Sequence, residues 1–298
     1  MRQMPNVSIC IPTYNRKCFL PQTLSSIYRQ TYRDFEIVIV DDGSTDGTDA
    51  LIAAQEFNIK YFAQTKSGEA AARNRLVELA DGKYIAFLDS DDLYFPDSLA
   101  RLVKSAESCN IPACGYGNSV KIDQNGNNLP TKAKVVNLPS GQITQTLFNK
   151  TILASSGSIY PSAALKNIRF DKQLSFCVGY DASLQISTKY DFIPQSQPVF
   201  LRRKHADNIS KEFFDNLKEK LKVLQRFYYE MGGKKIISRA DAYSRFAEIL
   251  YKIALAALKE DRPRREVMQL FENSLRLDFK LKVFLKMLLA NFYNHSFI

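Results

Sequence analysis

Three clusters of polar side chains follow three short apolar runs within the first hundred residues. The cluster Pro12–Asn15 follows the run Val7–Ile11, Asp41–Ser44 follows Glu36–Val40, and Asp89–Asp92 follows Tyr84–Leu88. If the runs are parallel strands, all three clusters lie at the same edge of one sheet, and open α/β sheets bind their ligands at that edge. The spacing therefore predicts a binding site made from these three clusters.

The second and third clusters are acidic, which limits the ligands that such a site can take. The chain has no Gly-x-Gly-x-x-Gly after its first apolar run and no Gly-x-x-x-x-Gly-Lys-Ser/Thr, so it lacks the usual backbone cradles for phosphate. Carboxylates repel a diphosphate unless a hard cation lies between them, and Mg²⁺ or Mn²⁺ takes one or two carboxylates together with phosphate oxygens. The clusters therefore predict a metal-bridged nucleotide diphosphate site, in which the cation neutralises charge as the diphosphate leaves.

Each acidic cluster alone has a simpler interpretation. Asp41–Gly43 could form only a turn, with Ser44 or Thr45 capping the following helix. Asp89–Asp92 could be a solvated loop ahead of Pro96, a residue type that fits the first turn of a helix. An isolated Asp-x-Asp triplet is common by chance, whereas polar clusters after three successive strands are much less easily accidental.

The segments that must position these clusters alternate between strand and helix patterns. The expected strands are short, rich in β-branched or aromatic residues, and comprise Val7–Ile11, Glu36–Val40, Lys60–Ala63 and Tyr84–Leu88. Apolar residues recur at helical spacing between them, at Leu20, Leu24 and Ile27, at Ala50, Leu51 and Ala54, and at Ala72, Leu76 and Leu79. Nearly continuous apolar strands separated by helices indicate an α/β fold, with a Rossmann-like parallel sheet covered by helices on both faces.

The pattern changes twice in the rest of the chain. Residues 111–200 contain a turn at Asp123–Asn128, a break at Pro139–Gly141 and an extended segment at Val199–Arg202, so we expect mixed strands that complete the sheet. Beyond Ile209, apolar stripes at helical spacing cover residues 213–228, 246–257 and 267–275, and an apolar segment follows from Leu281 to Phe292. We therefore expect one domain over residues 1–210 and a basic helical region over residues 211–298.

Composition and charge narrow the class of protein. The 298 residues are 45% hydrophobic and 12% aromatic, which is enough for a sizeable core and excludes a disordered chain. The net charge of +10 is uneven: residues 1–100 carry 10 basic and 14 acidic groups, residues 101–200 carry 10 and 5, and residues 201–298 carry 21 and 12. A nucleic acid or a membrane would therefore meet mainly the C-terminal third. We do not expect nucleic-acid binding, because no recognised motif is present and the sheet edge is acidic.

The sequence also gives an expectation for the cellular compartment of the protein. The run Val7–Ile11 ends at Pro12 and is too short for a signal core, and no stretch of about 18 uncharged apolar residues occurs. Five cysteines form no Cys-x-x-Cys pair and are odd in number, which favours reduced, mostly buried thiols. We therefore expect a cytoplasmic protein.

The two strings that carry the polar clusters resemble a known family. VSICIPTYNRKCFLPQTLSSIYRQTYRDFEIVIVDDGSTDGT and SGEAAARNRLVELADGKYIAFLDSDDLYFPDSL are similar to the family-2 inverting glycosyltransferases. The resemblance is dense across residues 5–105, fades between 106 and 150, and returns in shorter pieces to about residue 210. It implies the A-type glycosyltransferase fold, a nucleotide-sugar donor that is often UDP-linked, and a divalent cation, Mn²⁺ or Mg²⁺. The implied activity is of the hexosyltransferase type, in surface polysaccharide or glycolipid synthesis.

The resemblance also implies roles for individual residues. Carried over by position, the implied contacts are Pro12 and Tyr14 with the base, Asp42 with the base or ribose, Gly68 and Arg73 with the nucleotide, Asp89 and Ser90 with the ribose and sugar, and Asp91 with the metal. Two of these residues have a structural alternative. Arg73 could form an ordinary surface salt bridge, and Tyr14 could pack against the first helix.

An inverting displacement needs a base on the face of the sugar opposite the leaving diphosphate, and a carboxylate usually supplies it. In similar enzymes this base belongs to a Glu-Asp pair that opens a helix after a Phe-Asp segment. Here Phe170–Asp171 precedes Tyr180 and Asp181, so Asp181 falls at the position of the base while Tyr180 stands where the family often has Glu. The alternative is that Asp181 is only a favourable charge at a helix N-terminus.

The basic segment Arg202–His205 resembles a loop found late in the catalytic domain of many relatives. A neutral imidazole at His205 could complete a metal shell, and the basic side chains could face phosphates. His205 could equally be an ordinary exposed histidine. We also expect Ser155–Ser158 on the acceptor side, because similar enzymes place a strand of small residues there.

The basic C-terminal region admits two interpretations. Its charges could be the solvated face of an ordinary helical subdomain. Alternatively, Lys280, Lys282 and Lys286, which alternate with apolar residues, could place the last segment on anionic lipid, which would suit a lipid-linked acceptor.

The sequence therefore predicts a metal-dependent inverting glycosyltransferase with a glycan or lipid-linked acceptor. A nucleotidyltransferase is disfavoured, because the Gly-rich, Arg- or Lys-bearing phosphate loop after the first strand is missing. A catalytically inactive nucleotide-sugar-binding module stays an alternative, because Tyr180 departs from the family pattern.

Overall fold

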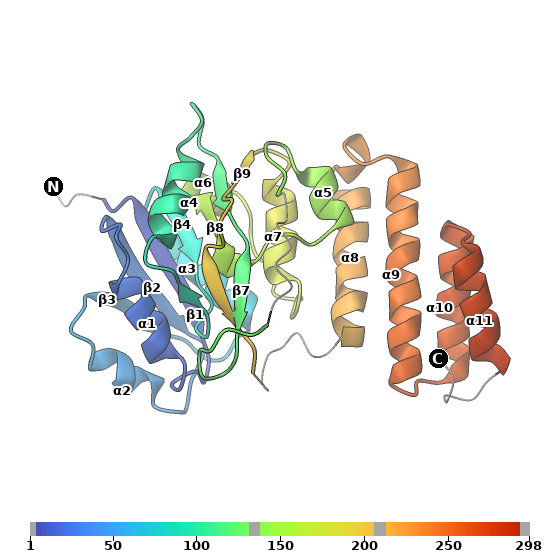
Figure 1. Cartoon of the computed structure of the whole chain (residues 1–298), viewed down its shortest axis with the longest axis horizontal. Helices are drawn as coiled ribbons and strands as arrows, with labels where there is room; N and C mark the ends of the chain where they lie inside the picture. Colours follow the sequence, from blue (N-terminus) through green and yellow to red (C-terminus); the bar gives the residue numbers. More distant parts are fainter. Residues whose placement is uncertain (1–3, 131–137, 206–212, 293–298) are drawn as a thin grey trace. The chain divides into compact units, whose positions relative to one another are not determined.

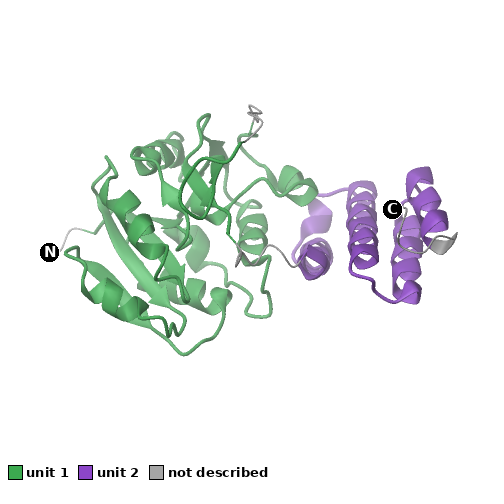
Figure 2. Ribbon diagram, turned by 60° about the horizontal axis from the view of Figure 1, so that its bottom comes forward, with its two compact units in different colours: residues 1–208 green, residues 209–298 purple. Residues whose placement is uncertain are grey.

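Two structural units make up the chain. The computed structural model describes residues 4–130, 138–205 and 213–292 (Figure 1). Unit 1 comprises Met1–Asn208 and is an α/β unit, and unit 2 comprises Ile209–Ile298 and is helical (Figure 2). Among the described residues, no helix has the length and apolar character needed to cross a membrane.

Four parallel strands form one half of the large sheet, as the sequence predicts. They are β1 (Val7–Thr13), β2 (Phe35–Asp41), β3 (Ile59–Ala63) and β4 (Tyr84–Phe87). β1 lies between β2 and β4, and β3 lies beyond β2 at the edge (Figure 1). Because the strands are parallel, the three polar clusters and the segment after β3 meet at the carboxyl edge of the sheet.

The helices that follow these strands bury them. They are α1 (Leu20–Tyr28), α2 (Thr48–Ala53), α3 (Glu69–Leu79) and α4 (Ser98–Ala106). One core cluster contains Val7, Ile9 and Ile11 of β1 and the stripe Leu20, Leu24 and Ile27 of α1, and all six are fully buried. The periodicity of the first hundred residues thus predicts the elements and the packed face of α1. For α2 the predicted stripe is wrong, because Ala50 and Ala54 are exposed and Thr48 and Ile52 are the buried residues.

The remaining strands of the sheet make it mixed. β8 (Ser158–Pro161) is antiparallel to β4, β6 (Cys114–Tyr116) is antiparallel to β8, and β9 (Phe192–Pro194) is parallel to β6. The order across the seven strands is β3-β2-β1-β4-β8-β6-β9. The intervening short helices are α5 (Thr144–Asn149), η1 (Ser155–Gly157), α6 (Ser162–Lys166) and α7 (Val178–Ile186).

A second sheet of three strands departs from the prediction. The extended segment expected at Val199–Arg202 is β10 (Phe200–Arg203), and it lies outside the large sheet, between β5 (Leu93–Tyr94) and β7 (Ser119–Ile122). β5 directly follows the acidic cluster and pairs antiparallel with β10. This pairing carries the end of β10, and with it His205, to the cluster Asp89–Asp92.

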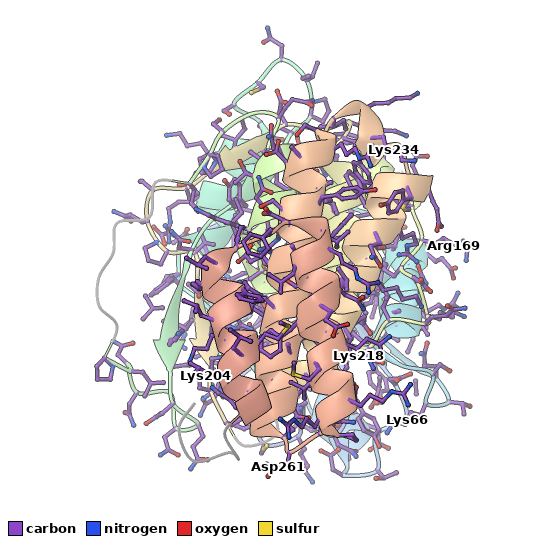
Figure 3. The ribbon with its side chains drawn as sticks, turned by 90° about the vertical axis from the view of Figure 1, so that its right-hand side faces the viewer. Lys66, Arg169, Lys204, Lys218, Lys234 and Asp261 are labelled. Atoms are coloured by element: carbon purple, nitrogen blue, oxygen red, sulfur yellow. The ribbon has the colours of Figure 1, made fainter. Side chains whose placement is uncertain are left out.

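Unit 2 has the helices that its apolar stripes predict. They are α8 (Phe213–Glu230), α9 (Arg239–Lys259), α10 (Arg264–Leu277) and α11 (Leu281–Phe292), with a short turn η3 (Gly233–Lys235) between the first two. Ser274 of α10 donates its hydroxyl to the carbonyl oxygen of Ala247 in α9 at 2.7 Å. Two lysines of unit 2 lie against aromatic rings (Figure 3). Lys218 Nζ is 5.1 Å from the ring centroid of Phe214, and Lys234 Nζ is 4.8 Å from that of Tyr229.

Close packing of α4 on β6 generates a test of the fold. A Cβ atom on Gly115 would clash with the carbonyl oxygen of Leu102 and lie 2.9 Å from Ile159 Cγ2. We expect Gly115→Ala to lower the free energy of unfolding by about 2 kcal/mol, since overpacking a core typically costs about 1–3 kcal/mol. Chemical denaturation measures the change, and Ser119→Ala on the half-buried strand β7 is the control. Equal stability of the wild type and Gly115→Ala would contradict this packing.

Candidate functional site

The segments after β1 and β2 are tied together by hydrogen bonds. The backbone N–H of Asn15 donates to Ser44 Oγ at 2.8 Å, and Asn15 Oδ1 accepts from the backbone N–H of Thr45 at 2.8 Å. Asn15 has a φ of 49°, in the left-handed region that asparagine tolerates better than most residues. Asp41 Oδ1 accepts from the backbone N–H of Ser44 at 2.8 Å. The first two clusters therefore meet, as predicted.

The simpler interpretation of the second cluster, as a cap for the next helix, is wrong. Ser44 and Thr45 are engaged with Asn15, and helix α2 has no side-chain bond at its N-cap, Gly47. Asp46 instead accepts from the backbone N–H of Thr48 at 3.1 Å and from the backbone N–H of Lys17 at 2.9 Å. The segment after β2 thus holds the segment after β1 as well as starting α2.

Asp42 is buried, and its carboxylate holds the segment after β3. Oδ1 accepts from Gln64 Nε2 at 2.7 Å and from the backbone N–H of Ser67 at 2.8 Å, and Oδ2 accepts from the backbone N–H of Gly68 at 2.8 Å. Gly68 has φ 91° and ψ 162°, a backbone conformation that is essentially restricted to glycine. Asp42 and Gly68 are thus brought together, and the contact of Asp42 with a base or ribose stays a prediction.

We call the four segments that meet at this edge the rim. The rim comprises Pro12–Asn15, Asp41–Ser44, Gln64–Gly68 and Asp89–Asp92. Pro12 is half-buried within β1, and Tyr14 lies just beyond it with 36% of its surface exposed. The Nζ atom of Lys66 lies 3.9 Å from the centroid of the Tyr14 ring. Sequence reasoning missed Lys66, because nothing in its neighbours distinguishes it from an ordinary surface lysine.

Arg73 is buried, so its interpretation as an ordinary surface salt bridge is wrong. Only 2% of the residue is exposed, and its guanidinium lies 4.7 Å from the ring centroid of Phe87. Nε donates to Glu69 Oε1 at 2.7 Å and Nη2 donates to Asp89 Oδ1 at 2.9 Å. Nη1 is buried and has no hydrogen-bond partner within the described residues. Buried donors are normally paired, so this N–H is an exception within the described part of unit 1.

The acidic cluster is held in place by buried hydrogen bonds. Asp92 Oδ2 accepts from Ser156 Oγ at 2.7 Å, and Ser156 Oγ accepts from the backbone N–H of Asp89 at 3.1 Å. Ser90 is 6% exposed, and its carbonyl oxygen accepts from Thr23 Oγ1 at 3.0 Å. Sequence reasoning placed Ser156 on the acceptor side and missed this anchoring role.

Charge repulsion remains inside the cluster. Burial, together with the negative charges of Asp89 and Asp91, raises the pKa of the Asp92 carboxyl well above its usual range. A shift of this kind means that the ionised cluster is strained by desolvation and like charges. A cation bound at the rim would relieve that strain.

The prediction that the basic side chains of Arg202–His205 face phosphates is wrong for Arg203. Arg203 is 1% exposed, and its guanidinium donates to the carbonyl oxygens of Asp91 and Gln124, both at 2.8 Å, and to Gln22 Oε1 at 2.7 Å. Its backbone N–H donates to Asp92 Oδ1 at 3.0 Å. Arg203 therefore fixes the backbone and side chains of the acidic cluster.

The structure brings the two expected metal ligands together. His205 Nε2 donates to Asp91 Oδ2 at 2.8 Å, and the ring of Phe19 lies 4.6 Å from the imidazole ring. The side chain of His205 is 2% exposed and that of Asp91 is 16% exposed, so the pair has limited access to solvent.

The donor set of this pair fits the predicted cation. A carboxylate oxygen and an imidazole nitrogen are ligands that Mn²⁺ accepts. The described part of the chain contains no group of three or more His, Cys, Asp or Glu side chains that could hold a metal. Two protein ligands are sufficient for Mg²⁺ or Mn²⁺ at a nucleotide site, where phosphate oxygens and water complete the shell.

Asp181 lies in the first turn of α7. It is 2% exposed, and its Oδ2 accepts from Gln185 Nε2 at 2.8 Å. The start of α7 packs tightly on η1, since a Cβ atom on Gly179 would lie 2.6 Å from Ser155 Oγ. Because the neighbouring Ser156 bonds to the acidic cluster, the helix that carries Asp181 begins next to the segment that anchors this cluster.

Tyr180, which stands where the family often has Glu, makes a contact that holds its helix. Its hydroxyl donates to the carbonyl oxygen of Leu147 at 2.8 Å and so anchors α7 to α5. The tyrosine therefore helps to position the helix that carries Asp181.

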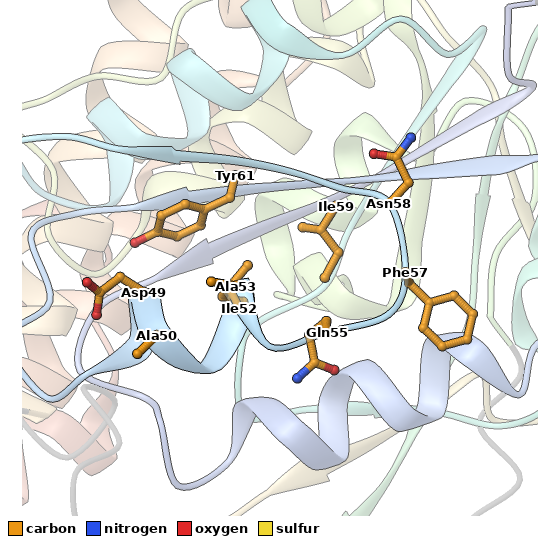
Figure 4. A pocket seen from close by; sticks show the side chains of 9 residues that line it. All are labelled: Asp49, Ala50, Ile52, Ala53, Gln55, Phe57, Asn58, Ile59 and Tyr61. Atoms are coloured by element: carbon orange, nitrogen blue, oxygen red, sulfur yellow. The ribbon is translucent and has the colours of Figure 1, made fainter.

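A pocket of about 520 Å³ lies between α2 and β3 and is separate from the predicted site (Figure 4). It is lined by Asp49, Ala50, Ile52, Ala53, Gln55, Phe57, Asn58, Ile59 and Tyr61. Tyr61 donates its hydroxyl to Asp41 Oδ2 at 2.8 Å, and burial with this bond raises the pKa of the phenol. None of the predicted site residues lines this pocket.

Comparison with known proteins relates the chain to one protein family. The profile described as Glycosyl transferase family 2 matches residues 8–168. Chondroitin synthase from Escherichia coli is 29% identical over 245 residues, which are 79% of this chain and 34% of that protein. The chain spans between 18% and 61% of the length of eight curated relatives that match it.

Solved structures share the fold. The mannosyltransferase PcManGT from Pyrobaculum calidifontis, in complex with GDP-Man and Mn²⁺, has a TM-score of 0.60 at 17% identity, over 97% of this chain and 85% of that chain. S. aureus TarS 1–349, in complex with UDP-GlcNAc, has a TM-score of 0.58 at 19% identity. The match covers 95% of this chain and 89% of that chain. The fold is that of the A-type glycosyltransferases, with a mixed Rossmann-like sheet and a helical C-terminal part.

The hydrogen bonds of Arg203 generate a test of the site. We expect Arg203→Met to lower the free energy of unfolding by about 3 kcal/mol, since each buried polar group left unpaired costs about 1–3 kcal/mol. We also expect weaker Mn²⁺-dependent binding of UDP, because the backbone of Asp91 loses its support. Denaturation and calorimetry measure the two effects, and Arg202→Met, on the exposed neighbour in β10, is the control. Equal losses in the two variants would contradict the anchoring role.

Proposed function

The chain belongs to glycosyl transferase family 2, and from that premise we propose that it transfers a sugar from a UDP-linked donor to a glycan or lipid-linked acceptor. The observation that carries the proposal is the meeting of the strand-end clusters at one rim. Arg73 donates from Nη2 to Asp89 at this rim, and Asp91 pairs there with His205. A cation and an anionic ligand would each find their partners in this arrangement.

The nucleoside would occupy the part of the rim formed by the first three strands. The half-exposed ring of Tyr14 next to Pro12 offers a face on which a base can stack. Asp42 holds the segment Gln64–Gly68 in place, so that the backbone there is fixed before a ligand arrives. A preformed wall of this kind reduces the entropy that binding costs.

The diphosphate and the cation would occupy the part of the rim after β4. Asp91 and His205 would hold Mn²⁺ or Mg²⁺, which when bound offsets the charge that develops on the leaving diphosphate. Asp89 and Ser90 would flank the ribose and the sugar. Arg73 adds a fixed positive charge next to Asp89.

We propose that transfer inverts the configuration by direct displacement, with Asp181 as the base. The acceptor oxygen attacks the anomeric carbon, its proton passes to the Asp181 carboxylate, and the bond from the anomeric carbon to the diphosphate breaks with its electrons on the diphosphate. Gln185 holds Asp181 Oδ2 through the bond at 2.8 Å. The anchoring of α7 by Gly179 and Tyr180 supports a fixed position for this carboxylate.

A cytoplasmic location also belongs to this proposal. Cys10, Cys18, Cys109 and Cys114 are free thiols, and Cys10 and Cys114 are buried. Free thiols are compatible with a reducing compartment.

The donor assignment can be tested by a screen. Ligands that bind the native state raise its stability, so the matching nucleotide sugar should raise the melting temperature when Mn²⁺ is present. UDP-linked sugars are expected to act and chelation of Mn²⁺ is expected to remove the effect. Stabilisation by none of the nucleotide sugars would contradict the proposed function.

The role of Asp181 predicts a separation of binding from chemistry. Asp181→Asn should keep UDP affinity but reduce sugar transfer by about 10²–10⁴-fold, the range that a general base contributes. Transfer assays and calorimetry measure the two quantities. Asp171→Asn, which replaces a carboxylate that accepts from the backbone N–H of Gln173, is the matched control. Full residual transfer by Asp181→Asn would reject it as the base.

The metal pair predicts a loss of cation binding. We expect Asp91→Asn to weaken Mn²⁺ binding at least about tenfold, since removing a charged ligand from a site with two protein donors leaves mostly neutral ligands. The electron paramagnetic resonance signal of free Mn²⁺, titrated with protein and UDP, measures this affinity directly. Asp123→Asn, at a carboxylate in an exposed turn, should bind Mn²⁺ as the wild type does. Unchanged affinity in Asp91→Asn would place the cation elsewhere.

A further inference from the structure

Helix α11 carries leucines on a face that the rest of unit 2 does not cover. Leu281, Leu285 and Leu289 have 63%, 51% and 43% of their surfaces exposed. Residues four apart lie on the same face of a helix. Val283 and Ala290 are 4% and 7% exposed and pack into the unit on the other side of the helix. α11 therefore has two apolar faces, and the unit buries only one of them.

The exposure is concentrated in one segment. Among the described residues, 13 large hydrophobic side chains are exposed, and four of them lie within residues 279–289. These four are Phe279 and the three leucines, and we call them the leucine face. Isolated exposed apolar residues are normal, whereas a contiguous group of them marks an interaction surface.

The sequence pattern alone could not make this distinction. Lys280, Lys282 and Lys286 lie among apolar residues, and nothing in the sequence distinguishes Val283 from Leu285 as the one to be buried. In the structure Val283 is buried and Leu285 is exposed, because α11 packs on α10 in one orientation.

The charges along α11 are all of one sign. Residues 281–292 contain Lys282 and Lys286 and no Asp or Glu. These two lysines are one turn apart, so they lie along the same flank of the helix. Lys280 is balanced by Asp278, whose Oδ2 lies 3.0 Å from its Nζ, so the unbalanced charge is that of Lys282 and Lys286.

We propose that α11 lies on an anionic lipid surface through its leucine face. Leucine and phenylalanine side chains would enter the boundary between headgroups and acyl chains, and the flanking lysines would reach the headgroups along their apolar stems. A helix of 12 residues is about 18 Å long at 1.5 Å per residue, so it can lie on a membrane but cannot cross one.

Charge favours this occupant over a second copy of the chain. Two α11 helices packed antiparallel through their leucine faces would bring the lysine flanks of both copies to the same side of the pair, and the helix supplies no acidic partner for them. An anionic surface instead attracts each of these lysines. The proposal does not depend on the catalytic assignment of the rim.

Vesicle flotation of the full chain tests the proposal. We expect tighter binding to vesicles of phosphatidylcholine with phosphatidylglycerol than to phosphatidylcholine alone, by about tenfold or more, since each lysine near an anionic surface contributes about fivefold. The double variant Leu285→Ser/Leu289→Ser should lose this binding. Met231→Ser/Ile236→Ser, at residues of the same unit that are 38% and 42% exposed, is the matched control and should bind as the wild type does.

Three outcomes would overturn the proposal. The first is vesicle binding by the leucine variant equal to that of the wild type, and the second is no preference of the wild type for anionic vesicles. The third is a wild-type dimer in light scattering that the leucine variant abolishes, since the face would then join two copies. Stabilisation by UDP with Mn²⁺ is measured in the same variants and should be unchanged, which separates this proposal from that of the glycosyltransferase.

Discussion

Repulsion among the carboxylates of Asp89–Asp92 is the constraint on which the rest of the candidate site depends. Three acidic side chains lie within four residues, and the burial of Asp92, together with the negative charges of Asp89 and Asp91, raises the pKa of the Asp92 carboxyl. Arg73 and Arg203 approach from α3 and β10, and Ser156 and Thr23 bind the same cluster from η1 and α1. Elements from across unit 1 thus hold a group of like charges together. Such an arrangement lowers the stability of the fold, and it is typical of functional sites. A cation between these carboxylates and a diphosphate would supply such a function, as we propose.

Some parts of the fold and of this site could be predicted from the sequence, and others could not. The four parallel strands and their helices follow from local patterns, and the meeting of the clusters follows from the rule that parallel strands end at one edge. The pairing of Asp91 with His205 was expected only because the chain resembles a family. The roles of Arg203 and Ser156 could not be predicted, since a buried arginine and an exposed one look alike in a basic segment such as Arg202–Lys204. The separate sheet of β5, β10 and β7 depends on pairings far apart in the chain, which no periodicity encodes.

The distinctive feature of unit 2 is an exposed apolar face on one helix. Its stripes predict its helices, but which apolar residues stay exposed depends on how α11 packs on α10. Polar chemistry is concentrated at the rim of unit 1, and an exposed apolar face with unbalanced lysines is concentrated in α11. A transferase with a lipid-linked acceptor would use both, one for the donor and one for the surface where the acceptor resides. The two proposals are argued from separate residues, so either can fail without the other.

A crystal structure of the chain with UDP and Mn²⁺ tests the central claim most directly, because the anomalous signal of manganese locates the cation without any assumption about the ligand. The account predicts one strong anomalous peak in contact with Asp91 and His205, with the diphosphate bound to it and the base near Tyr14. A peak remote from Asp91, or UDP bound in the pocket between α2 and β3 with the rim empty, would contradict the account.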